Sequence, residues 1–115
     1  MNTGDPVERE IELDATPEEV WEELADPDRL GEWLGAGVDL DLEPGGTGTF
    51  SFPDGGTRRA RVVAVEAGRM LSFTWWPVAP TVGPPTLVTI TIAPRGTGSR
   101  LHVREAPAAR LRAAA

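Results

Sequence analysis

The fold of this chain is decided by two neighbouring stretches, TPEEVWEEL at residues 16–24 and DPDRLGEWL at residues 26–34. Each begins with a residue that can cap a helix, followed by proline, which suits the first helical turn because its missing N–H would have no partner there. In the first stretch, Glu19 completes a capping box with Thr16. Apolar residues recur on one side of each stretch, so the sequence predicts two short amphipathic helices. Helices this short are not stable alone in water, so both must pack against the rest of the chain.

The remainder of the chain is typical of antiparallel sheet. Apolar and polar residues alternate in short runs, and the breaks between these runs are rich in glycine and proline, which indicates consecutive hairpins. One strand is predicted before the helices and six after them, at residues 7–14, 38–42, 47–52, 58–66, 70–76, 86–93 and 99–105. The helices must cover one face of this sheet, so the predicted class is α+β. The alanine-rich residues 107–115 are predicted to form a short terminal helix.

Composition limits the classes of function. The 115 residues are predicted to form one domain, residues 1–115, with a net charge of −7, which argues against nucleic acid or a membrane surface as a partner. The absence of cysteine excludes disulfides, thiolate nucleophiles and cysteine-ligated metal sites. The polar N-terminal segment lacks the features of a secretory signal, and no apolar run is long enough to span a membrane. A cytoplasmic protein is therefore expected.

Five segments in a fixed order carry a resemblance to a known family. They are residues 15–21, residues 26–33, Gly45-Gly46 before Phe50, residues 69–75 and residues 96–101. In this order and spacing the chain resembles the START-like (SRPBCC, helix-grip) superfamily, and within it the branch named after the activator of heat-shock-protein ATPase. The resemblance runs from about Val7 to Arg104 and implies a helix-grip fold, with a curved antiparallel sheet of about six to seven strands. That superfamily includes lipid carriers, cyclases and co-chaperones, so the resemblance implies no single activity.

The C-terminal end departs from the family pattern. The family normally ends in a long amphipathic helix that lies across the sheet and forms one wall of a cavity. Here residues 107–115 offer Leu111 as their one large apolar side chain, and a helix of this length would span about two turns. Three alternatives follow for the cavity: it is open, it is shallow, or another chain covers it. Our hypothesis is the third, in which a second copy covers the exposed apolar sheet and the protein is a homodimer.

The aromatic residues provide the candidate ligand-binding site. The chain contains four tryptophans and no tyrosine. Trp75 and Trp76 are adjacent in a predicted strand and must point to opposite faces, so one of them enters the core or a cavity. We predict an apolar cavity lined by aromatic side chains, with Arg61 or Arg69 near its mouth. The predicted ligand-binding residues are Trp33, Phe50, Phe52, Trp75, Trp76 and Arg61. The alternative is that these rings simply fill the core.

Other chemistry-bearing residues have simpler explanations. The glycine-rich residues 45–49 lack the lysine of a phosphate-binding loop and are followed by a strand, whereas a nucleotide loop opens a helix, so we interpret them as a turn and the edge of a strand. His102 is the single histidine, and no motif pairs it with a nucleophile or a carboxylate. Asp39, Asp41 and Glu43 lack the spacing and glycine of an EF-hand, so we interpret them as a solvated strand face.

The sequence therefore favours a non-enzymatic function. We expect the groove between sheet and helices to bind a small hydrophobic molecule or a protein partner, with no cofactor, no metal and no catalytic residue assigned. Two alternatives stay open: a cyclase- or hydratase-like enzyme that encloses an apolar substrate with help from His102 or a carboxylate, and a co-chaperone-like interaction module. A groove residue with a displaced pKa would favour the enzyme, and an exposed apolar patch would favour the interaction module.

Overall fold

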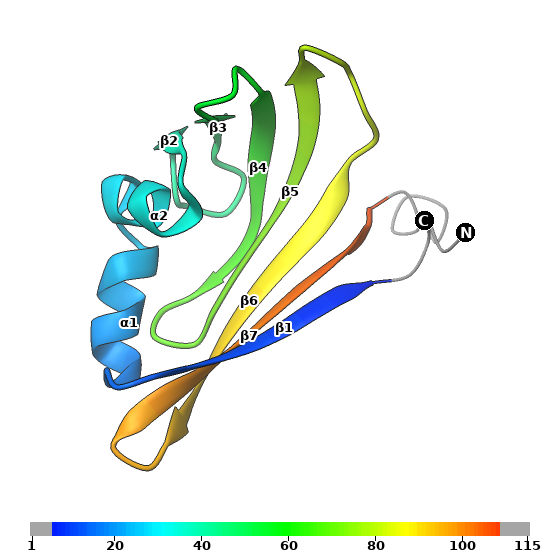
Figure 1. Cartoon of the computed structure of the whole chain (residues 1–115). Helices are drawn as coiled ribbons and strands as arrows, with labels where there is room; N and C mark the ends of the chain where they lie inside the picture. The colour runs from blue at the N-terminus through cyan, green and yellow to red at the C-terminus, as the bar shows by residue number, and fades with distance from the viewer. Residues whose placement is uncertain (1–5, 109–115) are drawn as a thin grey trace.

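The computed structural model describes residues 6–108 of the chain, which form a seven-stranded sheet and two short helices (Figure 1). All strand pairs are antiparallel, and the strand order is β1-β7-β6-β5-β4-β3-β2. The elements in chain order are β1 Val7–Leu13, α1 Pro17–Leu24, α2 Pro27–Leu34, β2 Gly37–Leu40, β3 Thr47–Ser51, β4 Thr57–Glu66, β5 Met70–Ala79, β6 Thr86–Arg95 and β7 Gly98–Pro107. The predicted α+β class and helix-grip architecture are confirmed.

The topology explains where the helices lie. Strands β2 to β7 follow one another as neighbours, whereas β1 pairs with β7 at the edge opposite to β2. The chain must therefore cross the whole width of the sheet between β1 and β2, and the helices α1 and α2 make that crossing. Both lie on the same face of the sheet, which we call the inner face, and the opposite face is the outer face (Figure 1). Neither helix of the described segment is long and apolar enough to cross a membrane.

The helix boundaries follow from the capping residues in the sequence. The backbone N–H of Glu19 donates to Oγ1 of Thr16 at 3.2 Å, and the backbone N–H of Thr16 donates to Oε1 of Glu19 at 2.9 Å, so the predicted capping box is confirmed. Hydrogen bonding to Thr16 lowers the pKa of Glu19 below its ordinary value, and the bond from the Thr16 backbone has the larger effect. At the second helix, the carboxylate of Asp26 accepts from the N–H of Asp28, and Gly35 closes α2 in the left-handed conformation.

Removing the first cap gives a direct test of this local argument. We expect Thr16→Ala to cost about 1 kcal/mol of unfolding free energy, because the backbone N–H of Glu19 in the first turn of α1 loses its acceptor, the Thr16 hydroxyl. Since the folded-state pKa of Glu19 is lowered, the contribution of the box is present at neutral pH and disappears as the pH falls through that pKa. Urea unfolding at neutral and acidic pH measures both effects. Thr97→Ala in the exposed β6–β7 turn is the control, and an equal loss in the two variants would contradict the role of the cap.

The core lies between the helices and the inner face of the sheet. At its centre the rings of Phe50 and Phe73 stack with centroids 5.5 Å apart, and Trp75 meets Phe50 edge-on at 5.1 Å. The fully buried apolar residues come from both helices and six of the strands: Val20, Leu24, Leu30, Leu40, Phe50, Ala60, Val62, Leu71, Phe73, Val88, Ile90, Ile92 and Leu101. The short helices are thus held by tertiary packing, as their length requires.

The predicted ends of several strands are wrong: β2 ends at Leu40 and not at residue 42, and β6 continues past residue 93 to Arg95. The sequence places a loop from Pro77 onward, but β5 continues to Ala79. Proline is tolerated there because the pairing of β5 with β6 does not extend beyond the pair Trp75 and Thr86. The nitrogen of Pro77 therefore needs no hydrogen bond to β6. The predicted terminal helix begins at Pro107, but this residue still belongs to β7. The rest of that helix falls on residues 109–115, which lie outside the described residues, and the homodimer inferred from its shortness stays a prediction.

Candidate ligand-binding groove

A groove of about 370 Å³ opens on the inner face between α2 and the strands β1, β7, β6 and β5. We call it the Trp75 groove. Its floor is formed by residues of neighbouring strands that pair side by side: Phe73 with Val88, Val88 with Glu105, and Glu105 with Val7. Apart from Glu105, these residues are apolar. The lining residues are Trp33 and Leu34 from α2, Phe73 and Trp75 from β5, Val88 and Ile90 from β6, Val103 and Glu105 from β7, and Val7 and Arg9 from β1.

A hydrogen-bonded carboxylate stands in this apolar lining. The indole Nε1–H of Trp75 donates to Oε2 of Glu105 at 2.9 Å, and the hydroxyl of Thr86 donates to the same oxygen at 2.5 Å. The guanidinium of Arg58 lies over the Trp75 ring, with its Cζ 4.7 Å from the ring centroid, at a distance suited to a cation–π contact. The orientation of Trp75 is therefore set by a cation against its face, a carboxylate at its N–H and the core rings beneath it.

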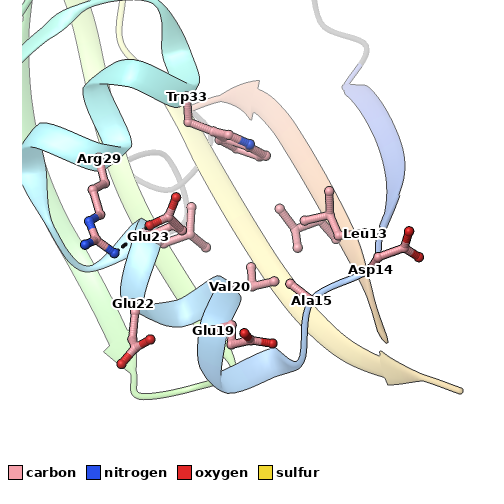
Figure 2. Close-up of a pocket in the computed structure, with 11 residues that line it drawn as sticks. Leu13, Asp14, Ala15, Glu19, Val20, Glu22, Glu23, Arg29 and Trp33 are labelled. Atoms are coloured by element: carbon pink, nitrogen blue, oxygen red, sulfur yellow. Dashed lines mark hydrogen bonds and ion pairs between the residues drawn. The ribbon is translucent and has the colours of Figure 1, made fainter. Parts of the chain in front are cut away.

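Trp33 stands between the Trp75 groove and a second groove. Its side chain is 39% exposed and projects from α2 toward the sheet (Figure 2). The second groove, of about 540 Å³, lies between the two helices and strands β1 and β7, and Trp33 lines both.

The second groove has an acidic rim. Asp14, Glu19, Glu22 and Glu23 line it together with a single base, Arg29 (Figure 2). The guanidinium of Arg29 lies 2.8 Å from a carboxylate oxygen of Glu23, and this hydrogen bond and charge raise the pKa of Arg29. Because the one cation of the rim is already paired, anionic molecules are disfavoured at this opening.

The structure brings together two of the predicted ligand-binding residues. Trp33 from α2 and Trp75 from β5 line the same groove. Phe50 does not line it, because it is 0% exposed and supports Trp75 from within the core. Phe52 meets Trp75 edge-on with ring centroids 6.3 Å apart, also outside the groove lining.

The other two predicted residues lie on the outer face. Trp76 alternates with the inward-facing Trp75, so its side chain points to the opposite side of β5. Arg61 sits between the buried Ala60 and Val62 and is exposed on the outer face of β4. The structure therefore places neither of them in the groove.

Sequence reasoning missed Arg9 and Glu105, although the strand periodicity contains both. Arg9 stands two residues after Val7 and two before Ile11, so it shares their inner face. Glu105 stands two residues after the inward-facing Val103 and four after Leu101. A charged residue at an apolar position of the alternation was the signal, and at Arg9 and Glu105 it identifies the polar groups of the groove.

His102 lies away from the groove. It alternates with Leu101 and Val103 and therefore faces outward, where its Nε2 lies 2.7 Å from Oε1 of Glu8. Its imidazole is thus on the wrong side of the sheet to assist a reaction in the Trp75 groove. Within residues 6–108, no group of three His, Asp or Glu side chains is arranged to hold a metal ion.

Comparisons with known proteins agree with the fold. The model of a family described as activator of Hsp90 ATPase homolog 1-like protein matches residues 14–115. The structure of MLL2253 from Mesorhizobium loti is similar, with a TM-score of 0.80 and 30% identity, covering 90% of this chain and 76% of that chain. No curated protein matches.

Two further solved structures share the fold. DynU16, a protein in the dynemicin biosynthetic locus, has a TM-score of 0.80 and 27% identity, covering 96% of this chain and 42% of that chain. CalU16 from Micromonospora echinospora has a TM-score of 0.71 and 24% identity, covering 89% of this chain and 60% of that chain. The chain therefore spans less than two thirds of the length of each of these two proteins.

Proposed function

The chain belongs to the family of activator of Hsp90 ATPase homolog 1-like proteins, and on that premise we propose that it binds a small, largely apolar molecule in the Trp75 groove. The observation that carries this proposal is that Trp33 from α2 and Trp75 from β5 line one groove together with apolar residues of the sheet. Small-molecule sites are concave, mostly apolar and about 300–1,000 Å³ in volume, with a few polar groups that fix the orientation of the ligand. The Trp75 groove fits this description at the smaller end.

The polar groups of the groove favour binding over catalysis. Oε2 of Glu105 is engaged by two donors, Trp75 and Thr86, which hold the carboxylate in place. Such a group is suited to positioning a ligand. The likeness to DynU16, a protein in the dynemicin biosynthetic locus, also favours a small molecule over a protein partner.

The first test is the response to Trp33→Ala. We expect this change to weaken binding of a neutral hydrophobic dye such as Nile red about tenfold or more, because the ligand loses the wall that the indole provides. The loss of unfolding free energy should be smaller, about 1 kcal/mol, because Trp33 is 39% exposed and shares little of the core. Dye fluorescence gives the affinity, and urea unfolding gives the stability.

Trp76→Ala is the matched control, because it removes the same side chain from the outer face. Dye affinity should be unchanged in this variant. Saturable dye binding that is equally tight in wild type and Trp33→Ala would place the site elsewhere. If fatty acids, flavonoids and the dye all fail to bind saturably, the proposed function is wrong.

A further inference from the structure

The two carboxylate oxygens of Glu105 are used differently. Oε2 accepts from the Trp75 indole and from the Thr86 hydroxyl. Oε1 has no hydrogen-bond or ion-pair partner among residues 6–108. Among residues 6–108, the one buried side-chain polar atom without a hydrogen-bond partner is Nε of Arg100. Because Oε1 of Glu105 also has no partner and is not such a buried atom, it is open to solvent. An ionised carboxylate oxygen can accept further hydrogen bonds, and this one has that capacity free.

Because Glu105 stands among apolar residues, its free oxygen affects how tightly a ligand binds in the groove. Its register partners are Val88 and Val7, and both line the groove with it. A ligand that fills the groove displaces the water around Oε1. If the ligand has no donor, the oxygen is left desolvated without a partner, which costs far more than losing a bond in water. A ligand that places a hydrogen-bond donor next to Oε1 replaces the lost water.

The acceptor is also rigid before any ligand arrives. Trp75 and Thr86 hold Oε2 from two neighbouring strands, and the Trp75 ring is itself held by Arg58 and by the stacked core rings. The remaining oxygen is thereby fixed in position, and little conformational freedom is lost when a ligand bonds to it. We propose that the Trp75 groove selects apolar molecules that carry a hydrogen-bond donor at one end, a hydroxyl or a protonated amine, which Oε1 of Glu105 accepts. This inference rests on the proposed function of the groove.

Arg9 would give the groove the opposite preference, for ligands that carry a negative charge. It lines the same groove, and its register partner is Val103, two residues from Glu105 on the same strand face. Arg9 forms no ion pair with another residue between 6 and 108. If Arg9 rather than Glu105 set the preference, molecules ending in a carboxylate would bind best.

Matched probes separate these possibilities. 1-Methylnaphthalene, 1-naphthol, 1-naphthylmethylamine and 1-naphthoic acid share one ring system and differ in the attached group. The amide and indole NMR resonances of labelled protein would be followed during each titration, with the Trp75 Nε1–H signal assigned from the Trp75→Phe variant. In the wild type we expect naphthol and the amine to bind about tenfold tighter than methylnaphthalene and to shift the Trp75 indole signal.

Glu105→Gln tests the residue itself. The amide keeps the size of the side chain and an oxygen acceptor for Trp75 and Thr86, but it places an NH₂ group where Oε1 stood. In this variant the roughly tenfold preference for naphthol and the amine over methylnaphthalene should disappear, so that all three probes bind about equally. Glu10→Gln, which changes a carboxylate on the outer face of the adjacent strand, should leave the preference unchanged.

The outcomes distinguish this inference from the function it rests on. If methylnaphthalene binds saturably in the groove but naphthol and the amine bind no tighter, donor selection is overturned and the proposed function stands. If naphthoic acid binds tightest, the selectivity belongs to Arg9 and the inference is also overturned. If no probe binds, both fail. The wild-type comparison decides the matter even if Glu105→Gln does not fold.

Discussion

Replacing Phe50 with alanine is expected to destabilise the fold by about 3–5 kcal/mol. Phe50 is 0% exposed, its ring stacks on Phe73 at 5.5 Å, and Trp75 meets its edge at 5.1 Å. The side chain of Phe50 therefore packs β3, which lies next to the β2 edge of the sheet, against β5. Truncation would leave a cavity that these rigid rings cannot close, so the cost includes both lost burial and empty space.

Urea unfolding of Phe50→Ala and Phe52→Ala provides the comparison. Phe52 is only partly buried and lies farther from Trp75, at 6.3 Å, so its truncation should cost less. A loss below about 1 kcal/mol in Phe50→Ala would show that the neighbouring rings relax into the space. Any change in dye binding by this variant would act through Trp75 or Phe73, the two groove residues whose rings Phe50 contacts, because Phe50 itself does not line the groove.

Both helices could be predicted from the sequence because their signals are local. Thr16 and Asp26 act on amides within the next three residues, and the observed helices begin at the two prolines that follow them. The far end of β5 could not be predicted in the same way. Whether Pro77 can remain in a strand depends on where β6 begins to pair, and that is decided by a hairpin partner elsewhere in the chain.

The site was predictable only in part for a related reason. Adjacent positions in a strand fix that Trp75 and Trp76 face opposite ways, but not which one faces inward. That choice depends on the register of the whole sheet, which shifts within β4 near Val62. The contact of Trp75 with Glu105 joins β5 to β7, strands that are not neighbours, so no local pattern predicts it.

The glycine-rich residues 45–49 have a packing role that the structure makes specific. Gly48 lies in β3 between β2 and β4, opposite Leu40 and Ala60. A Cβ at Gly48 would overlap the carbonyl oxygen of Asp39 and lie only 2.6 Å from Cα of Leu40. These are backbone atoms held in a ladder and cannot turn aside as a side chain could. Glycine is thus required here by the close approach of β2, which agrees with the turn-and-strand interpretation of this motif.

We expect Gly48→Ala to destabilise the fold by about 3 kcal/mol, the upper end of the usual cost of overpacking. Relief of the overlap requires β2 to move away from β3, and β2 follows directly on α2, which carries Trp33. Dye affinity should therefore fall together with stability, although Gly48 is not part of the groove.

Gly37→Ala is the control that separates close approach from the general effect of adding a methyl group. Gly37 lies in the same β2–β3 ladder, but its Cβ would meet its nearest atom, the Ser51 carbonyl oxygen, at 3.8 Å, an ordinary contact. Here alanine should leave the urea midpoint unchanged or raise it slightly, because it restricts the unfolded chain. Equal losses at Gly37 and Gly48 would mean that the ladder resists any side chain. A neutral Gly48→Ala would mean that β2 moves freely, and then the position of Trp33 over the groove could not depend on this ladder.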